Sequence, residues 1–353
     1  MANKRVGIIG AGNIGGFAWP EAKSLGYEVD LVLNSRGVVH LDGIEHGYLC
    51  TFQERGNVPE MLDYISLYHS NLDLVFLALP SGGDGETETN FIEYFGLHNI
   101  PMVTAGKSAF ANCYERLMPY RRIIGNRATV GGATGILPFL KEELDFERPF
   151  IVDLVVNGTL SYVVSQIWEG YSLETAIGNA ITEKYAEPPP PGEKANELDI
   201  MRGECQDVGK KLNIIVADVF LDYIGCLPAP GDIKVEHLTP HYLDEVTAQN
   251  ARMKYVVRIG SSYKPLVRFT EGAPGSVHAL FQTGNGRRLI IHGGFCEIPQ
   301  GSAMDKWIPH GGPGNAVRID QGGVPLLKVA AGAGPRATWS SMKKDALLLC
   351  PPH

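Results

Sequence analysis

The sequence predicts an α/β protein in which an N-terminal, doubly wound parallel sheet is followed by a second α+β domain. The chain has 353 residues with an ordinary globular composition, 44% hydrophobic and 20% charged, which suggests two domains. Apolar runs alternate with helix-like segments over roughly the first 140 residues, as expected for a parallel sheet with helical crossovers. After Pro149 this pattern changes, so the second domain begins near there.

The elements of the first domain follow this alternation. Residues 6–9 form a buried-strand run, and the helix expected over residues 14–25 contains Pro20, which predicts a kink. Further strands are expected at residues 29–33, 72–78 and 101–104, with a helix at residues 86–95.

The second domain is expected to combine helices with antiparallel strands. A strand at residues 150–156 precedes helices at 160–168, 173–183 and 196–212. Alternating segments at residues 255–259, 266–269 and 289–292 are typical of antiparallel strands. The proline run at residues 188–192 cannot continue a helix, and an extended loop is expected there.

Charge and cysteine content narrow the classes of function. The net charge of −8, without a dense basic block, argues against nucleic acid or an anionic membrane as the partner. The N-terminus runs at once into a strand, so no signal peptide is indicated, and no apolar run is long enough to span a bilayer. The six cysteines are scattered without metal-ligand spacing, so we expect reduced thiols in the cytoplasm and no metal site.

A glycine motif of the form GxGxxG lies between the first strand and the first helix. It consists of Gly10, Ala11, Gly12, Asn13, Ile14 and Gly15. In this context Gly10 permits the tight turn, Gly12 lets the backbone approach a pyrophosphate, and Gly15 lets helix and strand pack closely. The motif predicts a dinucleotide-binding Rossmann domain, with the phosphates at the helix N-terminus. The alternative is a glycine turn that serves packing only.

The end of the second strand indicates which nicotinamide cofactor is preferred. NAD-selective sites usually place Asp or Glu here, whereas this chain has Asn34, Ser35 and Arg36. A guanidinium with the Asn34 and Ser35 donors matches a 2′-phosphate, so NADP(H) is expected in preference to NAD(H), which stays possible. The alternative is that Arg36 is a solvated turn residue.

Two further loops follow buried strands at the carboxyl end of the sheet, where ligands bind in such folds. Leu79, Pro80 and Ser81 are expected to contact the nicotinamide or its ribose, unless they form a plain loop. Thr104, the last residue of the next strand, is expected to contact the cofactor, and Lys107 just after it is expected to bind substrate or cofactor rather than to lie on the surface.

An acid and a lysine share one helix face in the second domain. Asp207 and Lys211 are one turn apart, and Glu187 before the proline run could fold back toward them. A lysine near a carbonyl can donate a proton to its oxygen as hydride reaches the carbon. The alternative is a surface ion pair, with Lys210 and Lys211 both solvated.

Taken in order, several segments resemble homoserine dehydrogenase through almost the whole chain. The most specific is NGT-x-x-Y followed by YAEP. The segments are the glycine loop and residues 104–107, 130–132, 157–162, 185–188, 207–212, 314–317 and 331–334.

The resemblance implies a Rossmann domain over residues 1–145, a substrate-binding and dimerisation domain over 146–313, and a segment, 314–353, that returns to the Rossmann domain. It implies reduction of a small molecule, aspartate 4-semialdehyde, to homoserine with NAD(P)H, by direct hydride transfer without a catalytic metal. It also implies a homodimer, and no regulatory ACT domain is expected after the closing helix.

The resemblance also assigns roles to individual residues. Lys211 matches the proton-donating lysine of the family, and Lys107 matches a lysine close to substrate and cofactor. Glu187 and Asp207 match the acids that engage the amino end of the substrate. The remaining matches are to residues that bind the substrate, at Asn157, Gly158 and Thr159, and to a residue that binds the cofactor, at Gly334.

Three departures from the family pattern lie near the expected substrate. Members typically carry TANK where this chain has TAGK, with Gly106, and a compact VGGGIP where residues 130–138 are longer. The stretch between Glu187 and Asp207 is also longer. These changes keep two alternatives open, a related reductase of another carbonyl or imine and a catalytically silent NADP(H) sensor. Retention of both Lys107 and Lys211 argues against a sensor.

Overall fold

The computed structural model describes residues 3–41, 50–80, 83–186, 196–229, 231–248, 251–262, 264, 266, 272–283 and 286–352. Contacts divide the chain into two compact units. We call Met1–Thr129 with Thr338–His353 the N-terminal unit, and Val130–Ala337 the central unit. The domain limits expected from the sequence, at residues 145 and 313, follow the resemblance rather than contacts, and they stay a prediction.

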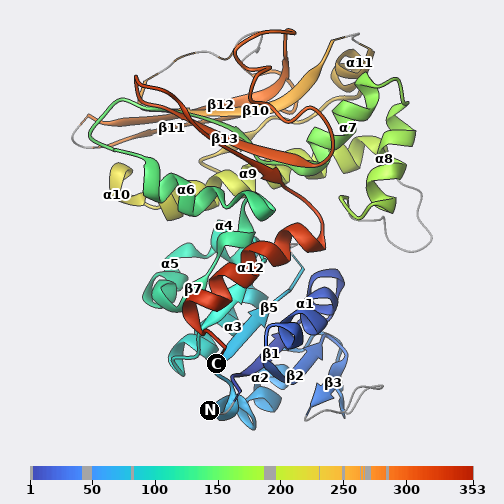
Figure 1. Ribbon diagram of the computed structural model, residues 1–353, viewed down its shortest axis with the longest axis vertical. Helices are drawn as coiled ribbons and strands as arrows, with labels where there is room; N and C mark the ends of the chain where they lie inside the picture. Colours follow the sequence, from blue (N-terminus) through green and yellow to red (C-terminus); the bar gives the residue numbers. More distant parts are fainter. Residues whose placement is uncertain are drawn as a thin grey trace. The chain divides into compact units, whose positions relative to one another are not determined.

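The N-terminal unit is built on a seven-stranded sheet with the order β4-β3-β2-β1-β5-β6-β7 (Figure 1). Its parallel strands are β1 (Arg5–Ile9), β2 (Glu28–Asn34), β5 (Leu74–Leu77), β6 (Met102–Thr104) and β7 (Ile124–Gly125). β1 lies between β2 and β5, so the strand order reverses there. The predicted doubly wound sheet is confirmed. An antiparallel edge that was not predicted is added by β3 (Gly37–Leu41) and β4 (Cys50–Thr51).

Helices surround this sheet, and the C-terminal helix belongs to the same unit. Trp339 and Met342 of that helix join the core formed by Ile8 and Phe76. Asp345 accepts hydrogen bonds from the backbone N–H of Arg127 and from its Nε, at 2.9 and 2.6 Å. The α-helices are α1 (Asn13–Ser24), α2 (Val58–Ser66), α3 (Glu86–Leu97), α4 (Ser108–Asn112), α5 (Tyr114–Leu117) and α12 (Pro335–Leu349). Short 3-10 helices are η1 (His69–Asn71), η2 (Met118–Ile123) and η3 (Arg127–Thr129).

The central unit contains a second seven-stranded sheet, with the order β14-β13-β8-β10-β12-β11-β9. Every neighbouring pair is antiparallel, as the alternating segments predicted. The strands are β8 (Ile151–Val155), β9 (Lys234–Val235), β10 (Met253–Gly260), β11 (Val277–Gln282), β12 (Arg288–Glu297), β13 (Gly314–Asp320) and β14 (Leu326–Ala331). Residues 267–269 of the predicted strand at 266–269, and the proline run, lie outside the described residues.

Three helices of the central unit begin at a residue whose side chain caps the helix. Asn157 accepts the Leu160 N–H, Ser172 accepts the Thr175 N–H, and Asn196 caps the long helix. The helices are η4 (Gly132–Thr134), α6 (Ile136–Glu143), α7 (Gly158–Trp168), α8 (Leu173–Thr182), α9 (Glu197–Val219), α10 (Leu221–Ile224) and α11 (Pro240–Ala248). Figure 1 shows α6, α9 and α10 along one side of the sheet. In the described part of the chain, no helix combines the length and apolar character needed to cross a membrane.

Candidate functional site

The glycine loop follows β1, at the point where the strand order reverses. Gly10 has φ +96°, and a Cβ there would lie 2.4 Å from the Ala78 carbonyl oxygen. A Cβ on Gly15 would lie 1.6 Å from the Gly10 oxygen, so both positions require glycine for packing. Gly12 differs, because apart from Gly12 itself and its two chain neighbours no atom of the described residues lies within 4 Å of a Cβ placed on it. The space beside Gly12 fits a phosphate that approaches the backbone.

The start of α1 suits an anion. Gly12 is its N-cap residue, and Asn13 and Ile14 are its first two residues. Among the described residues no side chain caps this end, and the first turn contains no acid. The backbone N–H groups of the first turn therefore lack helical partners and carry the partial positive charge of the helix dipole. Together with the space at Gly12, they fit the pyrophosphate of a dinucleotide.

The turn between β2 and β3 carries Arg36, and Arg55, from the segment after β4, reaches the same turn. The Asn34 side chain accepts the Arg36 backbone N–H at 2.8 Å, which fixes the turn. The Arg55 Nε donates to the Ser35 hydroxyl at 3.3 Å, and Arg36 and Arg55 are both exposed. Two guanidinium groups at the end of β2 match the charge of a phosphate. Sequence reasoning missed Arg55 because it follows Ser35 by 20 residues and only the fold brings them together.

The loops after β5 and β6 carry the other predicted residues of this unit. Leu79 and Pro80 follow β5 and are at least partly exposed, whereas Ser81 lies outside the described residues. Thr104 ends β6, and its hydroxyl accepts the Gly106 N–H at 2.9 Å. Lys107, partly exposed, is the N-cap residue of α4. The lysine therefore stands on a short, hydrogen-bonded turn at the carboxyl end of the sheet.

In the central unit, Lys211 is buried and held by two partners. Its side chain forms an ion pair with Asp207 at 2.6 Å and donates to the Val156 carbonyl oxygen at 2.8 Å. Only 6% of the residue is exposed, so the alternative of a solvated surface pair is wrong. An ammonium has three donors, and these contacts use two of them. Among the described residues no contact of the third is found, so it can bind a substrate oxygen.

Asn157 joins the acids beside Lys211. Its Nδ2 donates to Asp207 at 3.0 Å and to the Glu204 carboxylate at 2.7 Å, while its Oδ1 caps α7. Sequence reasoning missed Glu204, although it lies three residues before Asp207 and so shares its helix face. The described members of this cluster therefore include two carboxylates, one lysine and one amide. Glu187, the other predicted acid, lies outside the described residues.

Three further predicted residues lie around the start of α7. A Cβ on Gly158 would lie 2.8 Å from the Pro313 carbonyl oxygen, so a close approach requires glycine there. The Thr159 hydroxyl donates to the Tyr185 carbonyl oxygen at 2.6 Å. Gly334, at φ +92°, lies beside the Tyr185 ring. The central unit thus brings the NGT segment, Tyr185 and Gly334 together.

Comparisons with known proteins point to one family. A family model for homoserine dehydrogenase matches residues 136–347. The homoserine dehydrogenase of Methanocaldococcus jannaschii is 27% identical over 228 residues, which are 62% of this chain and 63% of that protein. The match therefore spans less than two thirds of this relative.

Solved structures share the fold over the whole chain. The homoserine dehydrogenase of Thermoplasma acidophilum has a TM-score of 0.64 at 19% identity, and 98% of each chain is covered. A hyperthermophilic archaeal homoserine dehydrogenase in complex with NADPH also has a TM-score of 0.64, at 16% identity over 98% of this chain and 96% of that one. Because the family model covers more than half of this chain, the chain belongs to the homoserine dehydrogenase family, as its motifs predicted.

Proposed function

We propose that this protein interconverts aspartate 4-semialdehyde and homoserine as an NAD(P)-dependent dehydrogenase. The observation that carries the proposal is the buried Lys211, held by Asp207 and Val156 with one donor left for a substrate. The Gly12 space and the uncapped start of α1 support binding of the cofactor. Family membership supports the choice of substrate.

The proposed chemistry assigns each residue a task. Bound nicotinamide supplies or accepts the hydride. Lys211 donates a proton to the carbonyl oxygen as negative charge develops there, and Asp207 holds its ammonium in place through the ion pair. Lys107 orients the substrate from the turn after β6. Glu187 and Asp207 bind the amino group of the substrate, and Asn157 holds the Asp207 carboxylate in place.

A turnover assay with several substrates tests this function. Purified protein is mixed with homoserine and NADP⁺, and separately with NADPH and a panel of aldehydes, ketones and imines, while absorbance of the reduced cofactor is followed. Turnover of homoserine supports the proposal. Turnover of another compound alone would favour the related reductase, and tight NADPH binding without any turnover would favour the sensor.

The proposal includes a preference for NADPH over NADH, which the two arginines beside Ser35 support. Arg36→Ala is expected to weaken NADPH binding by about 1.5–3 kcal/mol, roughly ten- to a hundredfold, because one charged contact is lost. NADH affinity should hardly change. Arg55→Ala should also weaken NADPH binding. Fluorescence titration of both cofactors measures the two affinities.

The control is Arg121→Ala, which removes an exposed arginine from the 3-10 helix Met118–Ile123. It should leave both affinities unchanged. An unaltered ratio of NADPH to NADH affinity in Arg36→Ala and in Arg55→Ala would refute phosphate recognition at this turn.

We further propose a homodimer formed through one face of the central sheet. The pairing of the strands places Leu280, Leu327 and Val329 on the same face. These side chains are 63%, 46% and 47% exposed. Apolar side chains this exposed on one sheet face are typical of an interface. Light scattering at micromolar concentration checks the mass.

The proposal also includes a cytoplasmic location, because all six cysteines are free thiols.

A further inference from the structure

A buried carboxylate lies beneath the turn that carries Lys107, and the proposed reaction does not use it. Glu88, on α3, is 3% exposed. Its Oε1 accepts a hydrogen bond from the Thr104 hydroxyl at 2.5 Å, and the backbone N–H of Ala109 donates to the same carboxylate. Glu88 therefore binds the chain on both sides of Lys107.

The backbone of the turn is shaped to admit this carboxylate. A Cβ on Gly106 would lie 2.1 Å from the Glu88 Oε1, so any larger residue would displace the acid. A Cβ on Gly85, just before α3, would lie 2.5 Å from the carbonyl carbon of Ser108. The two glycines thus allow α3 and the turn to approach closely. Gly106 is also the position at which this chain departs from the TANK pattern.

The positive charge of Lys107 acts on the Glu88 carboxyl. Burial has the largest effect and raises the pKa of this carboxyl above its ordinary value, whereas the hydrogen bonds from Thr104 and Ala109 and the charge of Lys107 act in the opposite direction and offset part of that rise. A buried carboxylate is costly unless it has partners, and these three groups are the partners that stabilise its charge. Lys107 and Glu88 are therefore coupled through space as well as through the backbone.

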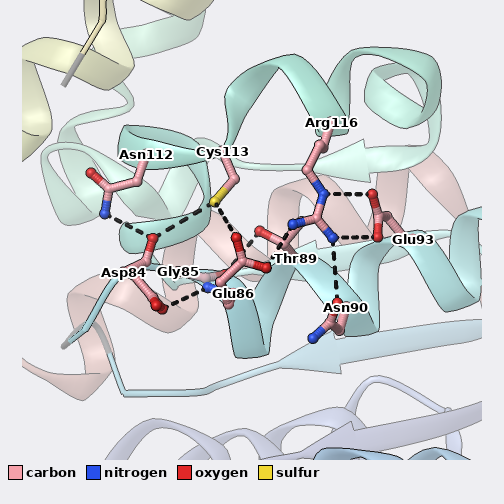
Figure 2. A network of polar contacts seen from close by, with 9 residues as sticks. All are labelled: Asp84, Gly85, Glu86, Thr89, Asn90, Glu93, Asn112, Cys113 and Arg116. Carbon is pink, nitrogen blue, oxygen red and sulfur yellow. Dashed lines mark hydrogen bonds and ion pairs between the residues drawn. The ribbon is translucent and has the colours of Figure 1, made fainter.

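The outer side of α3 is anchored independently of Glu88. Figure 2 shows Arg116 of α5 bound to Glu86 at 2.6 Å and to Glu93 at 2.7 Å. Asn112, at the end of α4, donates to the Asp84 carbonyl oxygen at 3.0 Å. These contacts hold α3 against α4 and α5. Loss of the Glu88 carboxylate would therefore release the turn without detaching the helix.

We propose that Glu88 is a positioning residue, which fixes the Thr104–Ala109 turn so that the Lys107 ammonium is presented in one orientation. The inference rests on the proposed function, in which Lys107 contacts the substrate. A displacement of about 1 Å in a substrate-orienting group can cost roughly a hundredfold in rate. Glu88 is expected to act on the reaction only through Lys107.

A double-mutant cycle between Glu88→Gln and Lys107→Ala tests the proposal. An amide offers one acceptor oxygen in place of two, so Glu88→Gln should weaken its hold on Thr104 and Ala109 and lower kcat/KM by about ten- to a hundredfold. In the Lys107→Ala background the same change should cost less than about twofold, because the group it positions is gone. If the fold-losses in kcat/KM of the two single variants multiply in the double variant, the proposal is overturned.

The matched control is Glu86→Gln, which removes an exposed carboxylate two residues earlier on the same helix. Its kcat/KM should stay within about twofold in both backgrounds. Circular dichroism and melting curves establish that each variant is folded at the assay temperature. If Glu88→Gln does not fold, Gly106→Ala tests the same contact from the other side, because its methyl group displaces the carboxylate. The same non-additivity is then expected.

A second measurement separates this proposal from the proposed function. The rate at which acetic anhydride modifies Lys107 is followed by peptide mass spectrometry, with Lys343 as an internal standard. Glu88→Gln should change the Lys107 rate by about twofold or more, because the loosened turn presents the amine differently, and Glu86→Gln should not. If the acetylation rate of Lys107 changes but the protein turns over no carbonyl, only the proposed function is contradicted. If that rate is unchanged and the losses in kcat/KM are additive in an active enzyme, only the positioning role is contradicted.

Discussion

Lys211→Ala is expected to lower kcat by a factor of about 10² to 10⁴, because the removed ammonium donates its proton only as the transition state forms. NADPH affinity should change by less than about twofold, since the contacts proposed for the cofactor lie at the Gly12 loop and the Arg36 turn. Stopped-flow measurement of hydride transfer, together with a binding titration of NADPH, separates the two effects.

Lys210→Ala provides the control for this substitution. The two lysines are neighbours on α9, but successive residues of a helix point about 100° apart, so Lys210 points away from the direction in which Lys211 contacts Val156 and Asp207. Its removal should be nearly silent. If Lys210→Ala were the damaging change, the register carried over from the family would be wrong. If neither mattered in an active enzyme, the proton would have to come from another group.

The stability of the protein is expected to rise between pH 7 and 9 because of a second buried lysine. Lys254, on β10, has no exposed surface, and its three hydrogen bonds go to the two hydroxyls of Ser161 and Ser165 and to the Ser161 carbonyl. Burial, with the nearby charge of Arg252, lowers the pKa of Lys254 to about 7, against an effect of Glu169 that raises it.

The direction follows from proton binding. The pKa of this lysine in the folded chain lies below its ordinary value of 10.5, so between these values the unfolded chain holds a proton that the folded chain lacks. The free energy of unfolding therefore increases with pH in this window, by roughly 2–3 kcal/mol between pH 7 and 9. As the pH falls below 7, Lys254 becomes protonated in the folded chain as well as in the unfolded chain. Well below pH 7 the cost of burying its charge therefore no longer changes with pH.

Urea unfolding of wild type and Lys254→Met at several pH values measures this contribution. The free energy of unfolding of the wild type should rise with pH relative to that of the variant. Lys254→Met also leaves the Ser161 hydroxyl without its partner, but this cost does not change with pH and so does not affect the slope. Lys234→Met, at an exposed lysine of β9, should show no such slope. A difference between wild type and Lys254→Met that stays flat from pH 7 to 9 would contradict a shifted Lys254.

Local sequence was sufficient to predict the elements near the cofactor loop. The helix expected at residues 86–95 is α3 (Glu86–Leu97), and the strand expected at residues 29–33 is β2 (Glu28–Asn34). Both segments are continuous and strongly patterned, so the information lies within a few neighbouring residues. The short strands β3 and β4 were missed because their pairing depends on the hairpin at Arg36 and on contacts distant in the chain.

The sequence by itself determined the doubly wound sheet, the glycine loop and the family, because spacing along the chain carries each of them. The sequence could not decide whether Lys211 is solvated, because an acid and a lysine at positions i and i+4 of a helix have the same spacing on the surface and in the core. Only the tertiary structure buries it against the Val156 carbonyl and brings Glu204 to Asn157 across 47 residues. Likewise, the Glu88 carboxylate meets Gly106 only in three dimensions, because burial and charge coupling depend on distance in space rather than along the chain.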